Sequence, residues 1–224
     1  MIEVRRVSHA FGERAVLRSV DATLAERRVA VLGANGSGKS TFARLLNGLV
    51  VPDEGTVSVH GRSTRRDAAA VRRMVGFVFT DPDAQIVMPT VAEDVAFGLR
   101  PRRLDKERTA RLVAEALDTV GLGGYADHPA HLLSGGQKQL LALTSVLVTE
   151  PRVLVCDEPT TLLDLPNTRR VLELIRGLPQ QVVMVTHDLE AVAGFDRVLV
   201  FDEGCIVADD TPEAAVAYYR QLVG

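Results

Sequence analysis

Short and almost continuous apolar runs recur along the chain, and each ends in glycine or in polar residues. Runs of this kind, bounded by turn residues, are typical of strands that are buried on both faces of a parallel sheet. Two further β-type runs open the chain, at residues 2–7 and 16–24. The buried runs are Val29–Leu32, Val75–Phe79, Val153–Cys156, Val182–Thr186 and Val198–Phe201.

Between these runs, apolar residues return at the spacing of an α-helix. Strands that alternate with helices predict a doubly wound α/β core. Residues 85–149 break the alternation because they are helix-rich and lack a buried strand, so we expect them to form a helical subdomain inserted into a core of about 1–84 and 150–224. The predicted helices are Lys39–Asn47, Glu107–Val120, Ser134–Val148, Thr168–Arg176 and Pro212–Leu222.

The composition narrows the class of protein. With 224 residues, 46% apolar and 25% charged, the chain is typical of one soluble globular domain. Its longest nearly apolar stretch, Leu140–Val148, is about half of what a membrane span needs, and the N-terminus lacks the apolar run of a secretory signal. A net charge of −3 argues against a nucleic-acid partner, and two widely spaced cysteines predict reduced thiols in the cytosol.

A glycine-rich segment follows the first buried run and precedes a predicted helix. It reads GANGSGKST and fits the phosphate-loop pattern G-x-x-x-x-G-K-[ST] in the strand-to-helix context that the pattern requires. Glycines let backbone N–H groups turn toward phosphates, the lysine adds a point charge, and the serine hydroxyl can bind Mg²⁺. The loop indicates a nucleoside triphosphate, and the candidate residues for it are Gly33, Ala34, Asn35, Gly36, Ser37, Gly38, Lys39, Ser40 and Thr41.

Two other buried runs end in polar side chains, where a doubly wound sheet places its ligands. Asp157 directly follows one strand and is the candidate metal ligand, together with Ser40. The next residue, Glu158, is the candidate general base for water. His187 follows another strand and is expected to hydrogen-bond the γ-phosphate. The remaining histidines have no evident partner and are interpreted as structural or surface residues: His9, His60, His128 and His131.

The pentapeptide LSGGQ lies 157 − 134 = 23 positions before the acidic strand end, counted from its serine. Ser134 can cap a helix there, and the glycines expose backbone N–H groups as a second anion site. With these motifs in order, the chain resembles the ATP-binding cassette (ABC) ATPases over essentially its whole length. The candidate residues of this second site are Ser134, Gly135, Gly136 and Gln137.

The resemblance implies a P-loop fold with an N-terminal antiparallel β subdomain and an inserted helical subdomain. It also implies that two subunits dock head to tail, with each ATP and its Mg²⁺ between the phosphate loop of one and the LSGGQ of the other; a homodimer is the simpler expectation. Asp164 matches the aspartate at that seam, and Phe11 matches the aromatic residue that stacks on adenine, although Phe11 could instead be a core residue.

Within that family, VGFVFTDPDAQIVMPTVAEDVAFG resembles the energy-coupling-factor importers of vitamins and metals, and TTLLDL is similar to the biotin-transporter ATPases. This resemblance implies a peripheral protein on the cytoplasmic face of the membrane. Its partners would be a transmembrane coupling protein and a substrate-binding membrane protein. A soluble ABC ATPase of cofactor assembly or DNA maintenance, an ATPase of another transporter class, and a weakly catalytic regulatory subunit are the alternatives.

Three positions depart from the family pattern. Thr80 stands where a metal-holding glutamine is usual, and its hydroxyl is a candidate Mg²⁺ ligand. Because threonine is shorter than glutamine, we expect slower basal hydrolysis and a tighter dependence of the ATPase rate on the assembled complex. Gln85 lies five positions later, but related transporters carry glutamine there as well as at the usual position, which argues against a substitute. Leu162 replaces a common glycine and Leu140 a common arginine, and both are expected to tune the dimer interface.

Overall fold

The computed structural model describes all 224 residues, and its N-terminal part is a four-stranded antiparallel sheet. The strand order is β2-β1-β4-β5, and β1 pairs with both β2 and β4. The sequence indicated the first two strands, but β4 and β5 were missed. The bounds are β1 Ile2–Phe11, β2 Arg14–Leu24, β4 Glu54–Val59 and β5 Arg62–Ser63.

The second sheet has the order β10-β9-β3-β8-β7-β6 and is parallel except for its edge strand β10. All five predicted buried runs lie in it, with ends that shift by one residue at most, and the doubly wound α/β fold is therefore confirmed. The bounds are β3 Arg28–Gly33, β6 Val75–Val78, β7 Val153–Asp157, β8 Gln181–Thr186, β9 Arg197–Asp202 and β10 Cys205–Asp210.

Successive residues of the central strands point into two different cores, because side chains alternate across a pleated sheet. Val29, Val31 and Val155 join the cluster that also holds Phe42 of helix α1 (Lys39–Leu46) and the inner face of the N-terminal sheet. Their neighbours along the strands, such as Ala30, join the cluster formed with the remaining helices. The central strands are buried on both faces, which explains why their interior positions are apolar.

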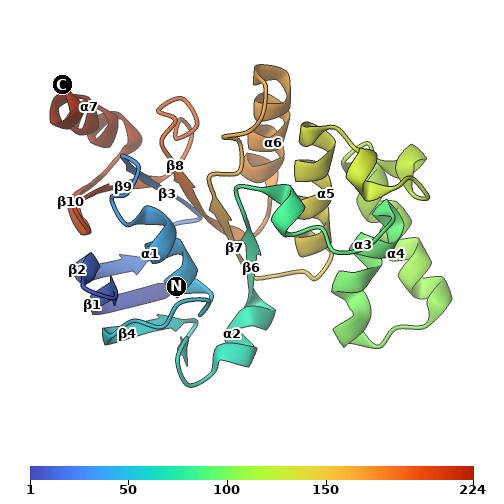
Figure 1. The fold of residues 1–224 in the computed structure, drawn as a ribbon, viewed down its shortest axis with the longest axis horizontal. Helices are drawn as coiled ribbons and strands as arrows, with labels where there is room; N and C mark the ends of the chain where they lie inside the picture. The colour runs from blue at the N-terminus through green and yellow to red at the C-terminus, as the bar shows by residue number, and fades with distance from the viewer.

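Four helices accompany the two sheets. Helix α1 contacts strands of both sheets, so it lies between them (Figure 1). Helices α6 and α7 cover the opposite face of the parallel sheet, where Ile175 and Ala215 are buried in the same cluster as Ala30. The sequence did not indicate the short helix α2. The bounds are α1 Lys39–Leu46, α2 Ala68–Met74, α6 Leu165–Gly177 and α7 Pro212–Val223.

Residues 85–149 form helices and no named strand, and they lie on one side of the sheets (Figure 1). Helix α3, Val91–Leu99, was missed by the sequence and packs against α4, Lys106–Thr119, and α5, Gly135–Leu147. Its N-terminus carries a capping box between Thr90 and Glu93. None of the helices is both long enough and apolar enough to cross a bilayer.

Helix α5 corrects one expectation. Leu140 was predicted to tune a dimer interface, but its side chain is 2% exposed and belongs to the core shared with β6 and β7. The prediction was wrong because Leu140 lies on the face of α5 that is turned toward the sheet. Leu162, in contrast, is 64% exposed and remains available to a partner.

Candidate active site

The phosphate loop connects β3 to α1, and two of its glycines are required by space and by backbone conformation. Gly33 has a φ of 156° and Gly38 a φ of 102°, both in the region that favours glycine. A Cβ atom on Gly38 would lie 2.7 Å from the carbonyl oxygen of Val16, and one on Gly33 would overlap the carbonyl oxygen of Phe201. These glycines let the loop pass closely under β2 and β9.

Lys39 begins helix α1 and is 4% exposed. Its Nζ donates a hydrogen bond of 2.7 Å to the carbonyl oxygen of Ala34 and lies 3.9 Å from Oε1 of Glu158. Burial lowers the pKa of Lys39, while Glu158 and Asp157 oppose that shift. The ammonium group is therefore desolvated and already points across the loop that an ATP phosphate would enter.

Three oxygen groups meet beside the loop, from three separate segments. The Ser40 hydroxyl donates to Oδ1 of Asp157 at 2.7 Å, and the Thr80 hydroxyl donates to the backbone carbonyl of Asp157 at 2.7 Å. Asp157 is 2% exposed, and burial raises its pKa against the opposing effects of Ser40 and Arg44. Nη2 of Arg44 lies 3.6 Å from its Oδ2, a contact that sequence reasoning missed.

Glu158 leaves the buried strand with a left-handed backbone, φ 50°, while its N–H donates to the carbonyl of Val185 at 3.0 Å. Backbone strain of this kind is concentrated at functional sites. Its carboxylate Oε2 lies 2.9 Å from Nδ1 of His187, whose side chain is 47% exposed. The sequence placed His187 near the site, and the structure brings its ring against Glu158.

A cleft of about 230 Å³ opens over the loop. Phe11 lines it and is 55% exposed, so Phe11 is not a core residue. Arg14 also lines the cleft and was not identified from the sequence. The cleft is lined by Phe11, Arg14, Val16, Asn35, Gly36, Gly38, Lys39, Ser40, Thr41 and Glu158.

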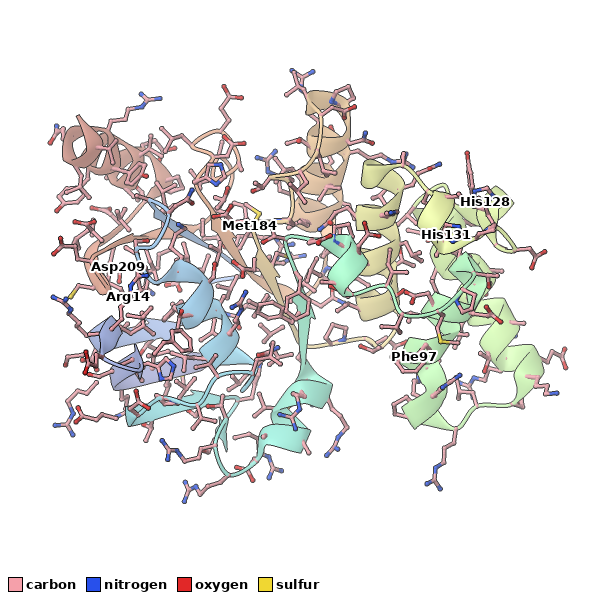
Figure 2. All side chains as sticks on the ribbon, in the orientation of Figure 1. Arg14, Phe97, His128, His131, Met184 and Asp209 are labelled. Atoms are coloured by element: carbon pink, nitrogen blue, oxygen red, sulfur yellow. The ribbon has the colours of Figure 1, made fainter.

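Three of the histidines outside the site, His9, His128 and His131, lie in different parts of the chain. His128 and His131 lie on the helical part, at the opposite end of the view from Arg14 (Figure 2). His9 has a structural role, as interpreted from the sequence: its Nδ1 lies 3.2 Å from Oδ2 of Asp53, and its ring packs edge-on against Phe11 with a centroid distance of 4.8 Å. The contact with Asp53 could not be read from the sequence because Asp53 is distant along the chain.

The LSGGQ residues do not line this cleft. Ser134 is the N-cap of α5, with a capping box to Gln137 as its side chain suggested. Asp164 is likewise the N-cap of α6 and accepts hydrogen bonds from the N–H of Asn167 at 3.0 Å and from its Nδ2 at 2.8 Å. Both helix N-termini lie at exposed residues, so their free N–H groups are accessible from outside the chain.

The two glycines of LSGGQ have different surroundings. A Cβ atom on Gly136 would overlap the side chain of Asn167, whereas one on Gly135 would meet nothing within 4 Å. We expect Gly136→Ala to lower the free energy of unfolding by about 1–3 kcal/mol, because Asn167 must leave Asp164. Gly135→Ala should leave it unchanged. Thermal unfolding of both variants measures this, and equal stability of the two would contradict it.

The side-chain amide of Gln85 is hydrogen-bonded to backbone groups at both ends. Its Oε1 accepts from the N–H of Phe79 at 3.1 Å, and its Nε2 donates to the carbonyl of Ala142 in α5 at 2.9 Å. Both ends of the amide therefore join the segment after β6 to the helical region. Of Thr80 and Gln85, only Thr80 has a hydrogen bond to Asp157.

Residues 17–161 match the ABC transporter family. The chain belongs to this ABC transporter ATPase family. The match includes the phosphate loop, LSGGQ and the acidic end of β7, and ABC ATPases hydrolyse ATP. The chain is therefore an ABC ATPase.

Relatives of this ABC ATPase match it over most of their length. A candidate ABC transporter ATP-binding protein of Deinococcus radiodurans is 55% identical over 99% of the chain and 98% of its own. The biotin transport ATP-binding protein BioM of Rhizobium etli is 46% identical over 99% of this chain and 98% of its own length. An energy-coupling factor transporter ATP-binding protein of Lactobacillus delbrueckii is 42% identical over 82% of this chain and 68% of its own length. The chain is an ABC ATPase of the energy-coupling-factor type.

Solved ABC ATPases share the fold. The CbiO1 protein of Clostridium perfringens, part of the transporter complex CbiONQ, superposes with a TM-score of 0.86 at 30% identity, over 99% of this chain and 92% of that one. A dimeric ATP-binding cassette in a post-hydrolysis state, bound to ADP and phosphate, superposes with a TM-score of 0.85 at 27% identity. The superposition covers 95% of this chain and 99% of that one. The predicted antiparallel subdomain and parallel sheet agree with these cassettes.

Proposed function

We propose that this ABC ATPase powers a membrane importer of the energy-coupling-factor type for a vitamin or a metal ion, with biotin favoured. The observation that carries the proposal is the 46% identity, over nearly the full length of both chains, to a protein named for biotin transport. A cobalt import ATP-binding protein of Syntrophus aciditrophicus, 44% identical, supports the metal alternative.

The residues of the site suit ATP hydrolysis in distinct roles. The loop Gly33–Thr41 would enclose the phosphates with its N–H groups, and Lys39 would place its charge on the terminal ones. Phe11 offers an exposed ring for adenine at the mouth of the cleft. Glu158 would take the proton of the attacking water, while His187 holds the carboxylate and reaches toward the γ-phosphate.

The oxygen groups beside the loop fit Mg²⁺, which prefers oxygen ligands and retains waters and phosphate oxygens. Ser40 would bind the ion directly, and Asp157 directly or through water, since their oxygens are 2.7 Å apart. Thr80 remains a candidate ligand, because its hydroxyl donates its proton to the Asp157 carbonyl and keeps its oxygen lone pairs for the ion. When bound, the ion neutralises charge on the phosphate oxygens.

We propose that the working unit is a head-to-tail dimer, most simply of two copies of this chain. None of the LSGGQ residues lines the cleft over the phosphate loop, and the N-termini of α5 and α6 are exposed elsewhere on the chain. Ser134, Gly135 and Gln137 of one copy would complete the site of the other, with Asp164 at the seam.

Co-purification tests the importer directly. The tagged chain, purified from detergent-solubilised membranes of its own host, should carry a polytopic coupling protein and a substrate-binding membrane protein and should reside on the cytoplasmic face. Deletion of its gene should abolish uptake of labelled biotin and spare cobalt uptake. Recovery without any membrane protein would favour a soluble ABC ATPase, and lost cobalt uptake alone would favour the metal importer.

The threonine at position 80 gives a further prediction. Thr80→Gln should raise the basal ATPase rate of the purified chain and reduce the stimulation by membrane partners, because a longer amide can reach metal and water. Thr80→Ser retains the hydroxyl and is the matched control. Phosphate release is measured with and without partners. Identical rates of wild type and Thr80→Gln in both settings would contradict the role of Thr80.

A further inference from the structure

The carboxylate of Glu158 is held on one side only. The Thr161 hydroxyl donates a hydrogen bond of 2.9 Å to Oε2, and Nδ1 of His187 lies 2.9 Å from the same oxygen. The other oxygen, Oε1, has no hydrogen bond and lies 3.9 Å from Nζ of Lys39. The two neighbours therefore fix Oε2 and leave Oε1 directed toward the phosphate loop.

The local backbone explains how Thr161 reaches Glu158. The left-handed conformation of Glu158 starts a turn in which the N–H of Thr161 approaches the Glu158 carbonyl at 3.4 Å. Thr160, between them, is buried and anchors the turn. Thr161 itself is exposed, and its hydroxyl makes no other hydrogen bond within the chain. Packing does not require a hydroxyl here.

We propose that Thr161 is a positioning residue for ATP hydrolysis: its hydroxyl orients the carboxylate of Glu158 so that Oε1 faces the attacking water. The inference rests on the proposed role of Glu158 as the base. A hydroxyl donor to a carboxylate is a charge-assisted hydrogen bond, which is stronger than a neutral one. It also holds Oε2 when the His187 ring is turned away or carries its proton on the other nitrogen.

Two substitutions at this position isolate the hydroxyl. Thr161→Val keeps the shape and removes the donor, whereas Thr161→Ser keeps the donor. Hydrogen bonds to charged groups predict a loss of about 10- to 100-fold in kcat for Thr161→Val, with KM for ATP unchanged. Thr161→Ser should restore kcat to near the wild-type value. Steady-state phosphate release by the purified full-length chain gives both constants.

A role at the dimer seam would give a different result. Thr161→Val combined with Glu158→Gln should still dimerise with ATP as Glu158→Gln does alone, and loss of dimerisation would overturn the proposal in favour of an interface role. Wild-type kcat in Thr161→Val, or equal losses in the valine and serine variants, would also overturn it. If the valine variant does not fold, Thr161→Ala is compared with Thr161→Ser by the same criteria.

Glu158→Gln is assayed in the same series. If it retains full turnover, the proposed base is wrong whatever Thr161 does. If it loses turnover while Thr161→Val does not, the base stands and the positioning role fails. The two failures are therefore distinguishable.

Discussion

Glu158→Gln is expected to bind ATP as tightly as the wild type and to turn it over about 10²–10⁴-fold more slowly, the usual contribution of a positioned general base. The amide keeps the size of the carboxylate and can still meet Thr161, but it cannot accept the proton of water. The left-handed backbone and two side-chain contacts at Oε2 indicate that this carboxylate is oriented for one task. Phosphate release and nucleotide titration together measure the effect.

A matched control is Glu173→Gln, an exposed glutamate of α6 with no hydrogen bond in the structure. It should hydrolyse ATP at the wild-type rate. Full turnover by Glu158→Gln would disprove the assigned role. A loss of turnover that only follows a loss of ATP binding would assign Glu158 to binding instead.

Lys39→Met should weaken ATP binding by roughly 30-fold or more, because truncating one partner of a desolvated charge pair costs about 2–5 kcal/mol. Methionine keeps much of the apolar stem but removes the ammonium group, which is 4% exposed and hydrogen-bonded to the loop carbonyl of Ala34. The phosphate then enters a loop without its cation. Titration with a fluorescent ATP analogue measures the dissociation constant.

Lys106→Met, at the exposed start of α4, is the control for the general loss of one positive charge. It should bind ATP normally. If Lys39→Met and Lys106→Met bind equally well, Lys39 does not contact the phosphates.

The sequence predicted the strands whose apolar runs are continuous, because those strands are buried on both faces. It missed β4, in which polar residues such as Glu54 interrupt the apolar ones, and β10, which has no buried residue and ends in two aspartates, among them Asp209. It missed α3 because the apolar residues of that helix, including Val91 and Phe97, were interpreted only as part of a family-like stretch. Edge strands and short helices depend on pairing and packing that an apolar pattern does not report.

The same contrast applies to the site. The loop and the acidic strand end could be predicted because contiguous residues carry their chemistry. The contacts of Arg44 with Asp157 and of Thr161 with Glu158 depend on helix phase and on a strained turn, which spacing alone does not define. The roles assigned to the site residues stay predictions until variants are assayed.

The proposed dimer explains why the anion-binding residues of LSGGQ lie apart from the ATP cleft of the same chain. The most direct test is the mass in solution of Glu158→Gln with Mg-ATP and with Mg-ADP, by light scattering. We predict twice the mass of one chain with ATP and the mass of a single chain with ADP, and a Ser134→Arg change should prevent the dimer. A single-chain mass with both nucleotides would contradict a site shared by two copies.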